Sequence, residues 1–297
     1  MAVPIAILSG VVILLLSPIF EGIGRKVKAI VHSRQGPPIT QTYMDILKLL
    51  GKEDVRCVKG TIFRYAPAFA LASFLVVGLL IPVGAGTLIP ADMITWIYFL
   101  TLGGAAILLM AASSGNPFAL AGGAREVMML LSVEPIVVAA LITAAMKSGS
   151  LRLEDMASWN LAHGPCVSMI SAGIAFLLVL QATLAKLPFD TAEAEGEVVG
   201  GALVEVSGPN LAVMKLALLV RQFVYSLVLV QIFFPWPSFS FMPLAIAALL
   251  VKVLVLFVLA AVVEAVSPRL RVDQAMTYAS RVLFVALAAL AFAAIGV

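Results

Sequence analysis

The sequence has little charge for its length. Only 12% of its 297 residues are Asp, Glu, Lys or Arg, whereas 62% are apolar, and the mean hydropathy is +1.12. A soluble domain carries roughly 25% charged residues. Because so few charged groups cannot cover a globular surface, we exclude a soluble protein and expect a chain whose outer surface faces lipid or other membrane subunits.

Metal ligands are also scarce. The two cysteines, Cys57 and Cys166, are far apart without a CxxC motif, and the only histidines are His32 and His163. Iron–sulfur clusters and structural zinc sites need about four such ligands, and c-type haem attachment needs CxxCH. We therefore expect no cofactor, metal or redox centre in this chain.

What the sequence does have is eight apolar runs, each close to the length of about 20 residues that crosses a bilayer. Proline and glycine interrupt most of the gaps between them. No basic residues precede the first run, which favours a retained helix over a cleaved signal peptide. The runs predict an all-α integral membrane protein with about eight transmembrane helices, forming a single polytopic membrane domain over residues 1–297. They cover residues 3–20, 65–84, 93–112, 125–146, 167–187, 210–234, 242–266 and 275–296.

Basic residues lie mainly on one side of the predicted spans. Nine of the nineteen Lys and Arg residues fall between Arg25 and Arg64, whereas the loops of the other side hold only Lys147 and Arg152. Basic loops face the cytoplasm. We therefore expect cytoplasmic loops at about 21–64 and 186–208, both termini on the outer side, and no nucleic-acid partner.

The first loop contains a predicted amphipathic helix. A turn at Pro37 and Pro38 precedes it, and polar and apolar residues then alternate at helical spacing. This helix either lies on the membrane surface or packs against a partner subunit. Its polar face comprises Gln41, Asp45, Lys48 and Lys52, and its apolar face comprises Met44, Leu47 and Leu50.

Several ionisable residues lie inside the predicted spans, where each costs roughly 2.5–3.5 kcal/mol. Glu126 and Glu134 are eight residues apart, about 80° around a helix and about 12 Å along it, so both can line one side of the fourth span. Such groups either pair across helices to fix the packing or form a chain that exchanges protons. The sixth span carries Lys215 and Arg221, and the seventh carries Lys252 and Glu264.

The densest acidic cluster follows the fifth run. Four carboxylates fall within eight positions, and Glu193 and Glu197 would repel each other at i, i+4 on a helix. Such a run is either a solvated loop or a partly buried group that shares protons, and the interleaved apolar residues favour burial. The cluster comprises Asp190, Glu193, Glu195 and Glu197, followed by Glu205.

Five motifs in order resemble those of the complex I subunit 1 family. The segment Lys186-Leu-Pro-Phe-Asp-Thr-Ala-Glu-Ala-Glu-Gly-Glu197 is similar to that family's PFDxxEAExE signature. The remaining four are Arg34-Gln-Gly-Pro-Pro38 with Asp45-Ile-Leu-Lys-Leu-Leu-Gly-Lys-Glu53, Gly122-Gly-Ala-Arg-Glu-Val-Met-Met-Leu-Leu-Ser-Val-Glu134, Glu205-Val-Ser-Gly-Pro209 and Pro268-Arg-Leu-Arg-Val-Asp-Gln274.

Within that family, the compact loops and the Arg125-Glu126 pair resemble the membrane subunit of energy-converting nickel–iron hydrogenases, the formate hydrogenlyase subunit 4 type. Respiratory members usually have Gln at the position of Glu126 and a longer first-loop motif. The resemblance implies a non-redox anchor and coupling subunit that docks a peripheral redox arm and relays redox energy to proton or sodium translocation. The alternative is the quinone-site subunit 1 of a respiratory NADH-quinone oxidoreductase.

The resemblance also implies partners and residue roles. The partners are hydrogenase large and small subunits and ferredoxin-like iron–sulfur subunits on the cytoplasmic side of a prokaryotic membrane, and antiporter-like membrane subunits. The nickel–iron centre and the iron–sulfur clusters belong to those partners, and no catalytic residue is expected here. The implied charge relay comprises Glu126, Glu134, Asp190, Glu193, Glu195, Glu197, Glu205, Lys215, Lys252 and Glu264. The implied docking residues are Arg34, Asp45, Lys48, Glu53, Arg269, Arg271 and Asp273.

Two functions from other classes compete with this one. A stand-alone ion-coupled transporter also retains intramembrane charges, but transporters commonly contain internal repeats, and the acidic loop has no counterpart earlier in the chain. A purely structural anchor would use its charges only for pairing.

Overall fold

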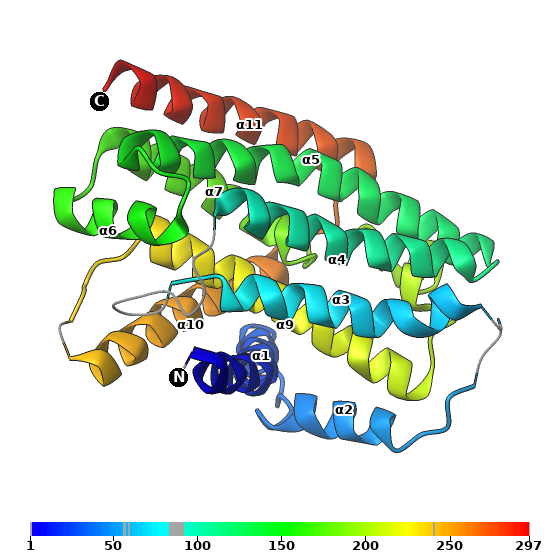
Figure 1. Ribbon diagram of the computed structural model, residues 1–297. Helices are drawn as coiled ribbons and strands as arrows, with labels where there is room; N and C mark the ends of the chain where they lie inside the picture. The colour runs from blue at the N-terminus through cyan, green and yellow to red at the C-terminus, as the bar shows by residue number, and fades with distance from the viewer. Residues whose placement is uncertain (1, 56–57, 59, 83–91, 240, 297) are drawn as a thin grey trace.

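The computed structural model describes residues 2–55, 58, 60–82, 92–239 and 241–296, with the side chains of residues 2–8 and 195 outside that description. Its regular structure is helical throughout these residues, apart from one isolated bridge between Asp92 and Arg152 (Figure 1). The all-α prediction is therefore confirmed.

Each of the eight predicted apolar runs coincides with a helix in the described residues. Six helices are long and apolar enough to cross a membrane, and α7 is a shorter apolar helix. This agrees with the prediction of about eight transmembrane helices. The eight are α1 (Ala2–Val31), α3 (Thr61–Leu79), α4 (Met93–Ser113), α5 (Pro117–Ser148), α7 (Val167–Thr183), α9 (Gly208–Phe233), α10 (Met242–Val266) and α11 (Val272–Ile295).

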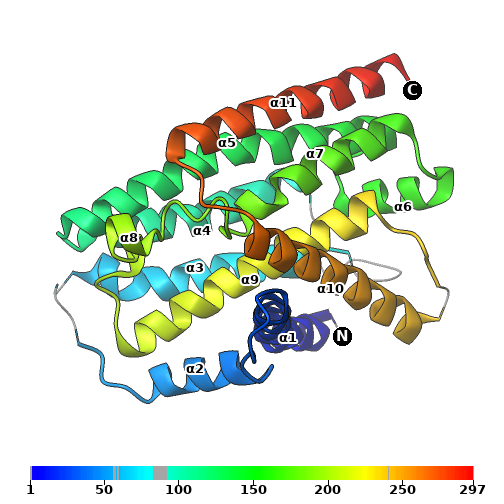
Figure 2. The ribbon, with the colours of Figure 1, turned by 180° about the vertical axis from the view of Figure 1, so that it is seen from behind.

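Helix α9 lies at the centre of the bundle, and 72% of its apolar stretch is buried. It packs against α1, α3, α7 and α10, while α5 packs against α4, α7 and α11. Figures 1 and 2 show α11 at the outer edge, on α5 and α7. Glu126 on α5 and Arg221 on α9 are therefore screened from the surroundings by the other helices.

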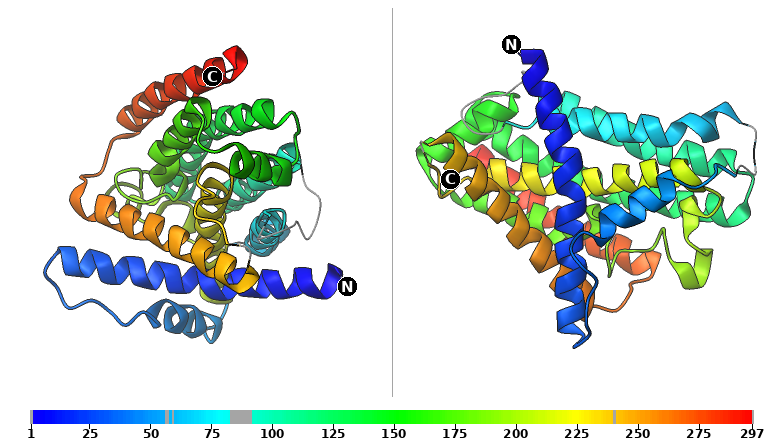
Figure 3. Two further views of the ribbon diagram at one scale, coloured as in Figure 1. Left: turned by 90° about the vertical axis from the view of Figure 1, so that its left-hand side faces the viewer. Right: turned by 90° about the horizontal axis from the view of Figure 1, so that it is seen from below.

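Helix α1 is longer than the sequence predicts. The apolar run ends at residue 20, but the helix continues to Val31, so the beginning of the predicted 21–64 loop is helical. Charged residues lower the hydropathy of this extension, yet Glu21, Arg25 and Lys28 all form ion pairs with other parts of the chain. Figure 3 shows that α1 crosses the direction of the other helices steeply.

Among the described residues, four short helices lie outside the eight long ones. Helix α2 (Gln41–Leu50) is the predicted amphipathic helix, and it packs on α9 and α1. Helix α6 (Leu153–His163) occupies a connection in which the sequence predicts no helix. The connection from α7 to α9 contains α8 (Glu195–Val198) and the 3-10 helix η1 (Gly201–Leu203). Helices α6 and α8 lie at opposite ends of the bundle (Figure 2), and we call these the α6 end and the α8 end.

Candidate functional site: a row of buried carboxylates

A buried ion pair joins α5 to α9. Arg221 Nη1 on α9 lies 2.5 Å from Glu126 Oε1 on α5, and the two side chains are only 8% and 14% exposed. Removal of one partner of such a buried pair strongly destabilises the folded protein, because the other charge is then left buried and uncompensated. The sequence singles out both residues as charges inside spans but does not indicate that they pair.

Glu134 lies two turns further along α5. It is within hydrogen-bonding reach of Thr101 on α4, and its Oε1 atom is buried without a hydrogen-bond partner among the described residues. Glu126, Glu134, Arg221 and Tyr225 line one cavity of about 30 Å³. Because one water molecule needs roughly 10–15 Å³ of such a cavity, the cavity can hold about two waters between the two carboxylates.

Glu193 lies on the other side of Glu126. Both line a smaller cavity of about 10 Å³ beneath the loop that follows α7. Burial and, to a lesser degree, the carboxylates of Glu126 and Asp190 raise the pKa of Glu193 to about 7, although Arg221 and Lys215 oppose this shift. Glu193, Glu126 and Glu134 therefore form a row that leads from the loop into α5, and we call it the carboxylate row.

Two glycines bring this loop onto α5. A Cβ atom on Gly122 would lie 2.4 Å from the Cα atom of Gly201, and one on Gly201 would lie 1.9 Å from the carbonyl oxygen of Ala192. Gly201 also has φ of +60°, which favours glycine. Both residues belong to Gly-Gly pairs, the one signal in the sequence that could have indicated this contact. The close approach of the two backbones places Glu193 beside Glu126.

We expect Gly201→Ala to displace the loop. Its methyl group would overlap a backbone carbonyl that cannot move as a flexible side chain can, so the substitution should destabilise the chain by ~2 kcal/mol or more. Thermal unfolding of the purified protein in detergent measures this effect. Gly196→Ala is the matched control in the same loop, because nothing lies within 4 Å of its added methyl group. Equal midpoints for the two variants would contradict the close contact.

The other acidic residues of this loop are held separately. Asp190 accepts a hydrogen bond of 2.8 Å from Arg269, and Glu197 lies 2.5 Å from Arg125 Nη1. Glu193 precedes α8 rather than sharing a helix face with Glu197, so the expected i, i+4 repulsion does not arise. The run is partly buried at Glu193 and exposed at Glu197, and the side chain of Glu195 lies outside the described residues.

Glu205 does not line either cavity of the carboxylate row. It accepts a hydrogen bond from Asn116, the residue that caps the first turn of α5 by accepting from the backbone N–H of Phe118. The carboxylate therefore binds the start of α5 rather than its interior.

Ion pairs at the α8 end also fix α1. Lys186 Nζ lies 2.7 Å from Glu21, and Glu264 on α10 pairs with Lys28. Sequence reasoning missed Glu21 because it lies just outside the first apolar run. Lys215 is exposed on α9, and its charge lowers the pKa of both Asp45 and Glu193. It therefore acts on the loop side of the carboxylate row.

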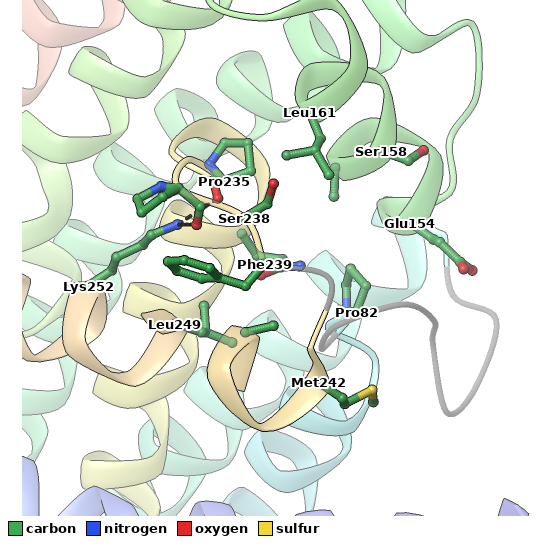
Figure 4. A pocket seen from close by; sticks show the side chains of 14 residues that line it. Pro82, Glu154, Ser158, Leu161, Pro235, Ser238, Phe239, Met242, Leu249 and Lys252 are labelled. Carbon is green, nitrogen blue, oxygen red and sulfur yellow. Dashed lines mark hydrogen bonds between the residues drawn. The ribbon is translucent and has the colours of Figure 1, made fainter. Parts of the chain in front are cut away.

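Lys252 lies apart from this row. Its ammonium group donates to the backbone carbonyls of Phe234, Pro235 and Pro237 at 3.3, 2.6 and 3.1 Å, which binds α10 to the segment that follows α9. It also lines a cavity of about 430 Å³ towards the α6 end, together with Glu154 and Ser158 of α6 (Figure 4). The structure brings no carboxylate of the carboxylate row to it among the described contacts.

The predicted docking residues fall into two groups. Asp45 is bound within the chain by Gln41 at 2.9 Å and Arg25 at 3.0 Å, and these hydrogen bonds lower its pKa. Arg269 is likewise engaged by Asp190. The remaining residues are exposed at the surface: Arg34, Lys48, Glu53, Arg271 and Asp273.

Three apolar residues of α2 also face outward. Met44, Leu47 and Leu50 are 60%, 61% and 47% exposed, while the opposite side of the helix packs on α9.

Among the described residues no group of three or more His, Cys, Asp or Glu could hold a metal, and Cys57 lies outside those residues.

Comparisons with known proteins find similar sequences over nearly the whole chain. The family described as NADH dehydrogenase matches residues 3–295. Hydrogenase-4 component C of Escherichia coli (strain K12) is 34% identical over 274 residues, covering 87% of this chain and 85% of that protein. Formate hydrogenlyase subunit 4 of the same strain is 32% identical over 286 residues, covering 92% of each chain.

A respiratory relative and a solved structure are similarly close. A subunit of the NADH-quinone oxidoreductase of Brevibacillus brevis is 33% identical, covering 84% of this chain and 78% of that protein. A chain of the membrane-bound sulfane sulfur reductase, an archaeal respiratory membrane complex, superposes with a TM-score of 0.89 at 30% identity, covering 97% and 98% of the two chains. The five-motif resemblance is thus confirmed, and this integral membrane protein belongs to the NADH dehydrogenase family, the family of complex I subunit 1.

Proposed function

We propose that this chain is the non-redox anchor and coupling subunit of a multisubunit membrane-bound nickel–iron hydrogenase complex in a prokaryotic cytoplasmic membrane. The observation that carries the proposal is the carboxylate row, in which Glu193, Glu126 and Glu134 line adjoining cavities. A row of this kind can pass a change of charge from a surface loop into the plane of the membrane.

The similarity to hydrogenase-4 component C and formate hydrogenlyase subunit 4, at 34% and 32% identity, supports the hydrogenase branch. The 33% identity to a subunit of an NADH-quinone oxidoreductase favours a second candidate, the quinone-site subunit of a respiratory complex. A stand-alone transporter is a less favoured third candidate, because these relatives are named as parts of larger enzymes.

The proposed docking surface lies at the α8 end, which we assign to the cytoplasmic side. It comprises the exposed charged residues of the first loop and of the connection before α11, with Arg269 and Asp190 tying the acidic loop to that connection at 2.8 Å. The hydrogenase large and small subunits and the ferredoxin-like subunits would bind there and carry the metal centres. Antiporter-like subunits would adjoin the bundle within the membrane.

The proposed mechanism starts at the acidic loop. A redox event in the docked arm changes the protonation of Glu193, whose pKa of about 7 lets it gain or lose a proton near neutral pH. The changed charge acts on the Glu126–Arg221 pair across the smaller cavity, and Glu126 then acts on Glu134 across the larger one. This passes redox energy to proton or sodium translocation without an electron carrier in this chain.

Purification of the tagged chain in mild detergent tests the proposal. Metal analysis, a hydrogen-evolution assay and quinone- and sulfur-reductase assays on the co-purifying complex identify the branch. Nickel, iron and hydrogen evolution are expected. Quinone reductase activity with flavin and iron would favour the respiratory branch, sulfur reduction would favour the kind of complex in the solved structure, and a metal-free single chain would contradict the proposal.

A further inference from the structure

A pocket at the α8 end is lined by three arginines. It lies where α5, the acidic loop and the start of α11 meet, and its volume is about 240 Å³. Because one water molecule needs roughly 10–15 Å³ of such a space, the pocket is large enough to admit a side chain. We call it the arginine pocket, after Arg125, Arg269 and Arg271.

Two of these arginines are held by carboxylates of the acidic loop. Arg125 Nη1 lies 2.5 Å from Glu197, and Arg269 donates a hydrogen bond of 2.8 Å to Asp190. A backbone hydrogen bond of 2.9 Å, donated by Leu270, also joins the connection before α11 to the segment that follows α7. Contacts within the chain therefore build the pocket and fix two of its cations.

The third arginine has no such partner. Arg271 is exposed, and its guanidinium forms no ion pair with the described carboxylates. It directly precedes Val272, the first residue of α11, which also lines the pocket. The first N–H groups of a helix have no partner within it and favour negative charge. Thr191, another lining residue, has a buried hydroxyl without a hydrogen-bond partner among the described residues. Unused donors therefore gather around this pocket.

The charges of the pocket do not cancel. Three guanidinium groups are matched by two carboxylates, those of Asp190 and Glu197, so one positive charge is left over. One further carboxylate, with a single negative charge, would balance it and could accept two parallel hydrogen bonds from a guanidinium. A phosphate monoester carries about −1.5 to −2 at pH 7 and would leave an excess of negative charge. The pocket therefore fits a carboxylate best.

We propose that the arginine pocket binds the carboxylate of an Asp or Glu side chain from a cytoplasmic subunit of the docked redox arm. The pocket adjoins the proposed docking surface, which includes Arg271. A side chain that the rest of a docked subunit holds beside the pocket binds at a high effective concentration, which favours it over a free carboxylate. The inference rests on the proposed function and deepens it, because it names the chemistry by which the arm is recognised.

Carbodiimide crosslinking in the intact complex tests this contact. The reagent joins an amine to a carboxylate that touches it, and it adds no spacer. In Arg271→Lys we expect an amide bond between the new amine and an Asp or Glu of a peripheral subunit, identified by mass spectrometry of the crosslinked peptide. Arg152→Lys is the matched control, because Arg152 is exposed beside α6, at the other end of the bundle, and should give no crosslink to that subunit.

A charge exchange provides the second measurement. Arg271→Glu turns the excess positive charge of the pocket into an excess of negative charge. The amount of the crosslinked subunit that stays bound during a salt wash should therefore fall at least fivefold. Replacement of that subunit's crosslinked carboxylate by Arg should restore binding, and Arg152→Glu should retain the wild-type amount.

Three results would overturn the inference while the redox subunits still co-purify with the wild-type chain. The first is a crosslink from position 271 to carboxylates of this chain alone, and the second is unchanged retention in Arg271→Glu. The third is thermal stabilisation of the wild-type complex by inorganic phosphate, relative to chloride at equal ionic strength, that Arg271→Glu loses, which would assign the pocket to a phosphate. A wild-type chain without any redox subunit would instead overturn the proposed function.

Discussion

Glu134→Gln is expected to stop ion translocation while the complex still assembles. Glutamine retains the size of the side chain and the contact with Thr101, but it cannot gain or lose a proton. A buried carboxylate oxygen without a hydrogen-bond partner costs free energy, and a role for the group in another state explains why this cost is retained. Because Glu134 is the innermost member of the carboxylate row, its loss should lower coupled turnover by about tenfold or more.

Acidification of inverted membrane vesicles during hydrogen turnover measures this effect, and blue-native electrophoresis checks assembly. Glu154→Gln is the matched control, because Glu154 lies on α6 beside the cavity at the other end of the bundle. We expect this variant to translocate ions at the wild-type rate. Wild-type translocation by Glu134→Gln would show that the residue only contributes to packing.

Glu193→Gln is expected to remove a pH dependence centred near pH 7. Burial and the neighbouring carboxylates raise the pKa of Glu193 to about 7, so the wild-type side chain changes charge within the working range of the complex. Coupled turnover in the wild type should therefore change with a midpoint near pH 7, and the variant should be flat there. Glu197→Gln, at an exposed position four residues away, should keep the midpoint.

The protonation of Glu193 should also make the folding stability of the chain depend on pH. Its pKa is higher in the folded chain than the ordinary 4.5 of an unfolded one, so the folded state favours the protonated form. Folding stability should fall as the pH rises from about 4.5 through about 7, by at most about 3.4 kcal/mol. Thermal unfolding in detergent between these pH values should show this decline in the wild type and a smaller one in Glu193→Gln.

The sequence predicts the architecture well because hydropathy determines which segments can cross a membrane. Each apolar run became a helix, and the amphipathic pattern from Gln41 onward became α2. The extension of α1 to Val31 was missed because Glu21, Arg25 and Lys28 read as loop residues. Ion pairs that form only in the folded bundle allow this charged segment to remain helical.

The sequence predicts which residues form the candidate site but not which of them contact one another. Glu126 and Glu134 are noticeable in the sequence because a charge inside a span costs free energy. Glu193 is noticeable because several other acidic residues lie close to it in the sequence. Neither pattern shows that Arg221 is the partner of Glu126, because these residues are 95 positions apart in the chain. The Gly122–Gly201 contact, which places Glu193, likewise depends on tertiary packing.

Redox events in a docked arm should change the protonation of carboxyl groups in this chain, and the whole proposed mechanism depends on this change. Redox-induced infrared difference spectra of the purified complex test it most directly, because protonated carboxyl groups absorb apart from carboxylates. We predict a difference band from a protonated carboxyl group that shifts in D₂O and is absent from Glu193→Gln. A spectrum that is identical in the wild type and in this variant would contradict the mechanism.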